Sequence, residues 1–305
     1  MKNKLNILPD NPEDNLGRFP SFLHRKLPKG NELFETGDLV KKYRLNTVCE
    51  EAKCPNRMEC YSKKTATFLA LGSACTRACG FCEIDFSKNP LPPEEDEPER
   101  IAQMTKELGL KHVVITMVAR DDLYDGGGAQ IARIIRTVRK TNPGITVEVL
   151  TSDFNGNIGA LDLVLLEEPE IFNYNIETVK RLTPKVRHTA TYERTLSILE
   201  YASHKGRNQF VKSGLMLGLG ETQEEVHEAI HDLHNAGVEI ITMGHYLQPS
   251  KRKLSVKQFI TPEQFKAYEE YGLSIGVPHM YCGPFVRSSY NADLFVKKHA
   301  EHTNT

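Results

Sequence analysis

The chain contains no tryptophan, and 39 Lys and Arg against 40 Asp and Glu leave a formal net charge of −1. A nucleic-acid-binding module needs a basic face with interleaved aromatic side chains. No apolar run has the length of a membrane span, and the opening M-K-N-K-L-N-I-L-P-D lacks the apolar core of a signal peptide. The sequence therefore argues against nucleic acid and against a membrane as partners.

Cysteine is scarce outside one stretch. Six of the seven cysteines form two groups of three, spaced x4 and x5 in the first and x3 and x2 in the second: Cys49, Cys54 and Cys60, then Cys75, Cys79 and Cys82. A structural zinc site usually has two Cys-x2-Cys pairs or one pair with two histidines, and neither group has that form. Three thiolates on a [4Fe–4S] cluster would leave one iron open. Zinc, disulfides and scattered core cysteines remain the alternatives.

Apolar runs alternate with helical stretches from Thr65 onward. The runs predict strands and the stretches between them predict helices. The strands are at 67–71, 112–118, 145–150, 171–176, 210–217 and 238–243, and the helices at about 97–108, 129–141, 158–167, 192–204 and 222–236. Such alternation is typical of a parallel sheet with helical crossovers, and six units predict a partial (β/α)6 barrel. Chemistry in barrels sits at the C-terminal strand ends, and Cys75 follows the first strand.

Before the barrel, residues 1 to about 30 are polar and interrupted by prolines, so we expect an extended arm. A short helix is expected from Glu32 to Arg44. We divide the chain into an arm with the first cysteine group (1–64), the barrel (65–280) and a C-terminal segment (281–305). Cysteines that must stay thiolate ligands need a reducing compartment, so we expect a cytoplasmic protein.

The second cysteine group, C-T-R-A-C-G-F-C, resembles the radical S-adenosylmethionine (radical SAM) superfamily. In that superfamily the open iron is chelated by the amino and carboxylate groups of S-adenosylmethionine, and an aromatic residue, here Phe81, packs near the adenine. Cleavage of the sulfonium releases a 5′-deoxyadenosyl radical. An unactivated C–H bond has no acidic proton, so a cofactor must supply such a radical.

The first cysteine group narrows the resemblance. C-E-E-A-K-C-P-N-R-M-E-C, followed shortly by the second group, resembles the lipoyl synthase family over roughly residues 30 to 297. This implies a TIM-like partial (β/α)6 barrel of the radical SAM type with an N-terminal cluster-binding extension. It also implies a sulfurtransferase that inserts two sulfur atoms at C6 and C8 of a protein-bound N6-octanoyl-lysine. The implied cofactors are S-adenosylmethionine and two [4Fe–4S] clusters, the auxiliary one being the sulfur donor.

The resemblance also implies the cluster ligands. Cys75, Cys79 and Cys82 would hold the radical SAM cluster. An R-S-S-Y run at 287–290 would add Ser289 to the auxiliary site of Cys49, Cys54 and Cys60, with Ser288 as second choice. We expect Cys282 to be a buried structural residue. If Cys282 were the fourth ligand instead, the auxiliary cluster would be an ordinary electron carrier.

Two loops after predicted strands carry further candidate residues. In V-A-R-D-D-L-Y-D-G-G-G-A, glycines permit close backbone approach to a ligand and a helix start favours a carboxylate, although a flexible turn explains the residues equally well. The resemblance favours cofactor binding by Asp125, Gly126 and Gly127, in a site shaped by Arg120, Asp121 and Asp122. In N-Y-N-I-E-T-V, at the end of the predicted strand 171–176, we expect Asn175 and Glu177 to point into the barrel mouth, with Glu177 accepting from a ribose; a helix cap at Thr178 is the alternative.

The expected partners follow from the resemblance. They are octanoylated lipoyl-carrier domains, namely 2-oxoacid dehydrogenase E2 subunits and the glycine cleavage H protein, and an electron donor such as flavodoxin or ferredoxin. The octanoyl arm would need an apolar tunnel. Two other interpretations remain open. One is a different radical SAM enzyme with an auxiliary cluster or sulfur insertion, such as biotin synthase, which would lack C-E-E-A-K-C-P-N and R-S-S-Y. The other is a non-enzymatic zinc or iron–sulfur module.

Overall fold

One eight-stranded sheet organises the protein. The structure is a computed structural model, and it describes residues 19–24, 32–206 and 209–289. Its strand order is β1-β2-β5-β6-β7-β8-β9-β10. The strands are β1 (Asn46–Thr47), β2 (Thr67–Ala70), β5 (His112–Met117), β6 (Thr146–Leu150), β7 (Ile171–Asn173), β8 (Phe210–Leu217), β9 (Ile240–His245) and β10 (His279–Gly283). Every neighbouring pair is parallel except β1 with β2. The parallel sheet expected from the sequence is therefore confirmed.

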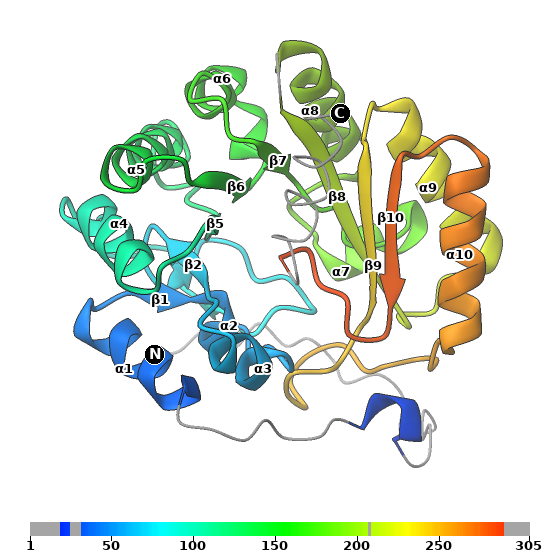
Figure 1. The fold of residues 1–305 in the computed structure, drawn as a ribbon. Helices are drawn as coiled ribbons and strands as arrows, with labels where there is room; N and C mark the ends of the chain where they lie inside the picture. The colour runs from blue at the N-terminus through cyan, green and yellow to red at the C-terminus, as the bar shows by residue number, and fades with distance from the viewer. Residues whose placement is uncertain (1–18, 25–31, 207–208, 290–305) are drawn as a thin grey trace, which may run out of the picture.

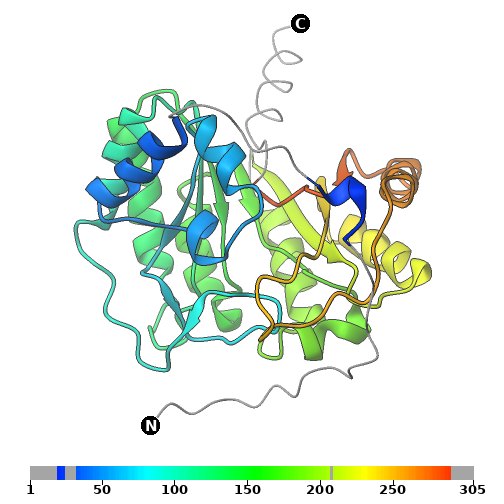
Figure 2. The same cartoon turned by 90° about the horizontal axis from the view of Figure 1, so that it is seen from below.

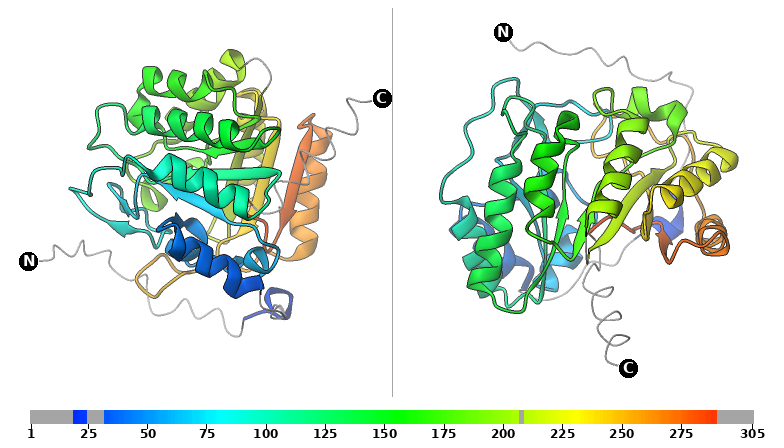
Figure 3. Two further views of the ribbon diagram at one scale, coloured as in Figure 1. Left: turned by 60° about the vertical axis from the view of Figure 1, so that its left-hand side comes forward. Right: turned by 90° about the horizontal axis from the view of Figure 1, so that it is seen from above.

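A helix follows each of the first six parallel strands and covers the outer side of the curved sheet (Figures 1 and 3). These helices are α4 (Glu97–Glu107), α5 (Gly128–Thr141), α6 (Ile158–Leu165), α8 (Tyr192–Lys205), α9 (Gln223–Asn235) and α10 (Pro262–Ser274). The sheet ends at β1 and β10. The prediction of a partial (β/α)6 barrel is confirmed, with β10 as one strand more than the sequence indicated.

The helices bury apolar stripes and begin at recognisable caps. In α5 the residues Ile131, Ile134, Ile135 and Val138 are all buried, at the spacing of a single helix face. Thr222 and Glu225 form the expected capping box at the start of α9. Among the described residues, no helix is long and apolar enough to cross a membrane.

The first cysteine segment (residues 49–60) lies at the β1 edge of the sheet, with α1 (Glu32–Lys42), α2 (Val48–Glu51) and α3 (Arg57–Ser62) (Figure 2). Thr36 Oγ1 donates to the Tyr61 carbonyl at 2.9 Å, and Thr47 Oγ1 lies 2.8 Å from the Tyr61 hydroxyl. Asn56 Nδ2 donates to the carbonyl of Phe285, beyond β10, at 2.8 Å. These bonds fix the segment to both edges of the open barrel.

Several boundaries differ from the predictions. β7 ends at Asn173 rather than 176, because the chain then leaves the ladder and Glu177 adopts φ of +66°. β9 starts at Ile240 rather than 238, because Gly237 (φ +76°) and Val238 N, which donates to Leu233 O, close α9. The short β3 (Ala74–Cys75) and β4 (Asp85–Phe86) were not predicted, nor were α10 and β10. Most of the expected arm, and the tail after residue 289, lie outside the described residues.

Candidate active site

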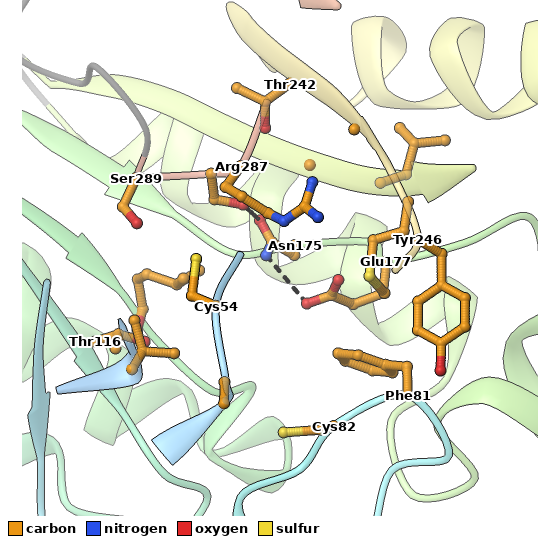
Figure 4. Close-up of a pocket in the computed structure, with 18 of the residues that line it drawn as sticks. Cys54, Phe81, Cys82, Thr116, Asn175, Glu177, Thr242, Tyr246, Arg287 and Ser289 are labelled. Atoms are coloured by element: carbon orange, nitrogen blue, oxygen red, sulfur yellow. Dashed lines mark hydrogen bonds between the residues drawn. The ribbon is translucent and has the colours of Figure 1, made fainter. Parts of the chain in front are cut away.

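A cavity of about 310 Å³ opens at the C-terminal ends of the parallel strands. Its wall takes residues from the ends of β5, β6, β8 and β9, from the loop after β7 and from the segment after β10. Cys54 of the first cysteine segment and Cys82 of the second cysteine segment (residues 75–82) both line it (Figure 4). The two cysteine segments therefore border one shared space.

The three thiols of the first cysteine segment are brought together by α2 and α3. Burial, together with the smaller effect of the neighbouring Cys54 thiol, raises the pKa of Cys49 to about 12 and that of Cys60 to about 11. Cys60 also acts on Cys49. The thiols spaced x4 and x5 thus lie near one another, with Cys49 buried and Cys54 and Cys60 half-buried. Their binding of a cluster stays a prediction.

The second cysteine segment forms a similar group on the loop from β3 to β4. Burial raises the pKa of Cys79 to about 12 and that of Cys82 to about 11, and both thiols interact with Cys75. Three thiols on one short segment are a donor set that suits an iron–sulfur cluster. Within the described residues, no three His, Cys, Asp or Glu converge on a single metal ion. The ligands of a [4Fe–4S] cluster bind different irons and are spread around a cage.

Arg77 holds the second cysteine segment against the barrel. Its side chain is 6% exposed and donates to Asp121 Oδ1 at 2.7 Å and to Asp153 Oδ1 at 2.6 Å. Asp121 Oδ2 accepts from Arg77 Nε at 2.8 Å, and Asp153 also pairs with Arg194. The role of Arg77 was missed, because a single arginine between cysteines carries no pattern that reveals distant carboxylate partners.

Arg120 and Asp122 support the start of the same loop. The Arg120 guanidinium is buried, makes a two-pronged pair with Asp122 at 2.8 Å and donates to the Leu71 carbonyl at 3.0 Å. Glu97 Oε1 accepts from the Leu71 amide at 3.0 Å. The structure places Arg120, Asp121 and Asp122 behind the loop that carries Cys75, where they determine its path.

Asp125, Gly126 and Gly127 lie at the start of α5 and are not among the residues that line the cavity. The Asp125 carboxylate accepts from Gly127 N at 3.0 Å and from Ala129 N at 2.8 Å, so it caps its own helix. Gly127 has φ of +92°, and a Cβ there would lie 2.3 Å from Leu71 Cδ1. Close packing and helix capping account for these residues in the structure, and their contact with cofactor stays a prediction.

Asn175, Glu177 and Phe81 line the cavity. Asn175 Nδ2 donates to Glu177 Oε1 at 3.0 Å (Figure 4). Burial raises the pKa of Glu177, and the buried Arg187 guanidinium opposes that rise. Arg187 Nη1 also donates to the Asn175 carbonyl at 2.7 Å. Phe81 packs with Tyr246 in a small apolar cluster. In Figure 4 Phe81 lies beside Cys82, Asn175 lies on the side of Cys54, and Glu177 lies between them.

The segment after β10 enters the barrel mouth over two glycines. A Cβ on Gly244 would lie 2.0 Å from the Val286 carbonyl oxygen, and one on Gly214 would lie 2.8 Å from Ser288 Oγ. Only glycine lets this backbone approach the strands so closely. Ser288 Oγ donates to Asn175 Oδ1 at 2.7 Å. Ser289 lines the cavity and lies on the side of Cys54 in Figure 4.

Cys282 lies on β10, opposite Met243 of β9. It is half-buried rather than fully buried, packs against the main core and is not among the cavity-lining residues. Burial raises the pKa of its thiol, and Glu269 raises it further.

Comparison with known proteins identifies the family. The sequence pattern of the radical SAM superfamily matches residues 69–233. The chain is 62% identical to the lipoyl synthase of Protochlamydia amoebophila (strain UWE25), over 97% of this chain and 94% of that protein. It is 52% identical to the lipoyl synthase of Chlamydia trachomatis serovar L2, over 94% and 93% of the two chains. The chain belongs to the lipoyl synthase family. As a radical SAM enzyme it uses a [4Fe–4S] cluster and S-adenosylmethionine.

Solved structures share the fold at low sequence identity. Streptococcus suis SuiB bound to its precursor peptide SuiA gives a TM-score of 0.56 at 13% identity, over 92% of this chain and 58% of that chain. The FeFe-hydrogenase maturase HydG from Carboxydothermus hydrogenoformans gives 0.54 at 13% identity, over 88% and 79%. At this identity the likenesses concern the fold alone.

Proposed function

We propose that this enzyme inserts two sulfur atoms, at C6 and C8 of an octanoyl chain that is amide-linked to a lysine of a carrier domain. When bound, S-adenosylmethionine and the radical SAM cluster supply the 5′-deoxyadenosyl radical that takes a hydrogen atom from each carbon, and the auxiliary cluster supplies the sulfur. No side-chain general base is required, because no acidic proton is removed.

One observation carries this proposal: the two cysteine segments border the same cavity. Cys54 and Cys82 both line it, and so do Phe81, Asn175 and Glu177. A substrate carbon in this space can face both segments without leaving the barrel. Holding two reacting groups close together in one site makes their reaction effectively intramolecular and therefore faster.

The chain's own residues would bind, orient and exclude water. Apolar side chains that suit an octanoyl arm line much of the cavity, among them Met117, Leu150, Leu215, Leu247 and Val286. Phe81 would pack near the adenine, and Asn175 and Glu177 offer an amide and a carboxylate for the ribose. Asp125, Gly126 and Gly127 would contribute to cofactor binding through the start of α5.

For the cluster ligands we propose two sites. Cys75, Cys79 and Cys82 would hold the radical SAM cluster and leave one iron for the amino and carboxylate groups of S-adenosylmethionine. Cys49, Cys54 and Cys60 would hold the auxiliary cluster with Ser289. An oxygen ligand is less suited than thiolate to iron–sulfur chemistry, which fits an iron that must be released when its cluster gives up sulfur.

The proposed partners are octanoylated carrier domains, the E2 subunits and the H protein named above, and a flavodoxin or ferredoxin as electron donor. We also propose a cytoplasmic location, because ligand thiols need a reducing compartment. The active site would be formed jointly by three parts of the chain, namely the segment from Cys49 to Cys60, the barrel and residues 281–305.

Isotope labelling tests the proposal. The auxiliary cluster is reconstituted with labelled sulfide, and the reaction is run with an octanoylated carrier domain in buffer with unlabelled sulfide. We expect at most one lipoyl group per chain, and we expect its sulfur to carry the label. Replacing Cys49, Cys54 and Cys60 together should leave 5′-deoxyadenosine formation intact and abolish thiolation. Many turnovers with label retained in the protein would make the auxiliary cluster an electron carrier and would contradict the proposal.

A further inference from the structure

Glu83 joins three segments that are far apart in the sequence. It directly follows Cys82, and its side chain is 4% exposed. Its carboxylate accepts from Lys53 Nζ at 2.8 Å, from Ser250 Oγ at 2.8 Å and from Arg252 Nη2 at 3.4 Å. A buried carboxylate needs such partners, because leaving it unpaired away from water is costly.

Lys53 brings the first cysteine segment to this junction. It lies one residue before Cys54 and adopts φ of +50°, a left-handed backbone conformation that non-glycine residues rarely adopt. Its amide donates to the Glu50 carbonyl at 3.0 Å, which closes the turn after α2. Lys53 and Glu83 both line the cavity. The 2.8 Å pair is thus a direct link from the residue before Cys54 to the residue after Cys82.

Ser250 and Arg252 bring the loop after β9 to the same carboxylate. That loop also contacts the second cysteine segment through its backbone, because Leu254 N donates to the Gly80 carbonyl at 3.0 Å. A Cβ on Gly80 would lie 3.0 Å from Leu254 Cδ1, so the two segments are closely packed. Glu83 therefore anchors the first cysteine segment to a junction that the barrel itself holds in place.

We propose that Glu83 is a positioning residue that, through Lys53, fixes the first cysteine segment relative to the second. This inference rests on the proposed function, since the spacing matters when a carbon prepared at one segment must react at the other. A misplacement of about 1 Å can slow such a step about 100-fold. Loss of the link should then uncouple the two steps, so that hydrogen abstraction continues while sulfur insertion slows.

The test compares three full-length variants with the unaltered protein, all reconstituted anaerobically. Glu83→Gln removes the charge and keeps the shape, and Lys53→Met removes the ammonium and keeps the stem. Glu107→Gln is the matched control, because Glu107 also accepts from a lysine, Lys42, at 2.7 Å, but on the exposed outer surface. The measurements are iron content, hydrogen–deuterium exchange along the chain, and 5′-deoxyadenosine formed per lipoyl group.

We expect Glu83→Gln and Lys53→Met to keep their iron and to exchange faster at residues 49–56. We also expect them to form about tenfold more 5′-deoxyadenosine per lipoyl group, the scale of an impaired positioning contact. Glu107→Gln should match the unaltered protein. Unchanged exchange at 49–56, or an unchanged ratio of 5′-deoxyadenosine to product despite lower stability, would overturn the proposal. If the unaltered protein makes no lipoyl group, the proposed function fails, and the exchange measurement still decides whether the link exists.

Discussion

Ser288 Oγ donates to Asn175 Oδ1 at 2.7 Å, and Asn175 Nδ2 donates in turn to Glu177 Oε1 at 3.0 Å. This chain of bonds ties the segment after β10 to the loop after β7. It occupies the hydroxyl of Ser288 inside the barrel, while the neighbouring Ser289 lies on the side of Cys54 (Figure 4). The two adjacent serines therefore have different surroundings.

That difference leads to a prediction about the fourth ligand of the auxiliary site. Ser289→Ala should still cleave S-adenosylmethionine, because the second cysteine segment is unchanged, but lipoyl formation should fall by about 10- to 100-fold. Ser288→Ala should lower cofactor cleavage and lipoyl formation together, because it removes a partner of Asn175. Both 5′-deoxyadenosine and lipoyl product are quantified by mass spectrometry.

Cys282→Ala serves as the control for this pair. Its half-buried thiol packs against the core, so we expect a loss of about 1–2 kcal/mol in the free energy of unfolding and no loss of iron. If Cys282→Ala loses a cluster and Ser289→Ala keeps both, the proposed ligand is wrong.

A second prediction concerns the count of clusters. The protein should take up two [4Fe–4S] clusters, one for each group of three cysteines. Replacing Cys75, Cys79 and Cys82 by Ala should halve the iron and acid-labile sulfide and abolish 5′-deoxyadenosine formation. Tightly bound zinc, or a single cluster in the unaltered protein, would contradict the two-site arrangement.

The barrel could be predicted because its central strands are continuous apolar runs. β8 was predicted with its observed bounds, Phe210–Leu217, and six of its eight residues are buried. β10 was missed because it is the last strand of the sheet and only Met280 among its five residues is buried. The capping box of α10, Thr261 with Gln264, was present in the sequence as T-P-E-Q and could have revealed that helix.

The site was predictable only where its residues form a local pattern. The two cysteine segments and the R-S-S-Y run are such patterns, and the structure brings Cys54, Cys82 and Ser289 to one cavity. The partners of Arg77 are at positions 121 and 153. Those of Glu83 are at positions 53, 250 and 252. Ion pairs over such separations depend on how the strands are ordered in the sheet, and a single sequence does not encode that order locally.

A third prediction follows from the Arg77 pairs. Asp153 is fully buried and joins Arg77 to Arg194, whereas Asp121 is 27% exposed. Asp153→Asn should therefore lower the free energy of unfolding by about 3 kcal/mol, because two guanidinium groups lose the carboxylate charge that they share. Asp121→Asn should lower it by about 1 kcal/mol. Urea denaturation of the metal-free protein measures both. Equal losses for the two variants would show that burial does not distinguish these carboxylates.

The last prediction concerns Glu148, which is fully buried in the barrel and accepts from Lys212 Nζ at 3.0 and 3.1 Å and from Asn173 Nδ2 at 2.9 Å. Burial alone would raise the pKa of this carboxyl, but Lys212 and His112 outweigh it and lower the pKa from 4.5 to about 2. Because the folded-state pKa is the lower one, the stabilisation is complete well above pH 4.5 and is lost as the pH falls towards 2. The full effect is about 3 kcal/mol.

Glu148→Gln should remove this part of the acid sensitivity and, because Lys212 loses its counter-charge, should cost about 3–5 kcal/mol near neutral pH. Urea denaturation at pH 6 and pH 3 gives the difference in unfolding free energy between the variant and the unaltered protein. That difference should shrink by about 2 kcal/mol at the lower pH, as the unfolded carboxyl becomes protonated before the folded one. Glu99→Gln, which removes an exposed partner of Arg133, should leave the pH dependence unchanged. A constant difference for Glu148→Gln across this range would mean that the Lys212 pair does not hold the carboxylate ionised.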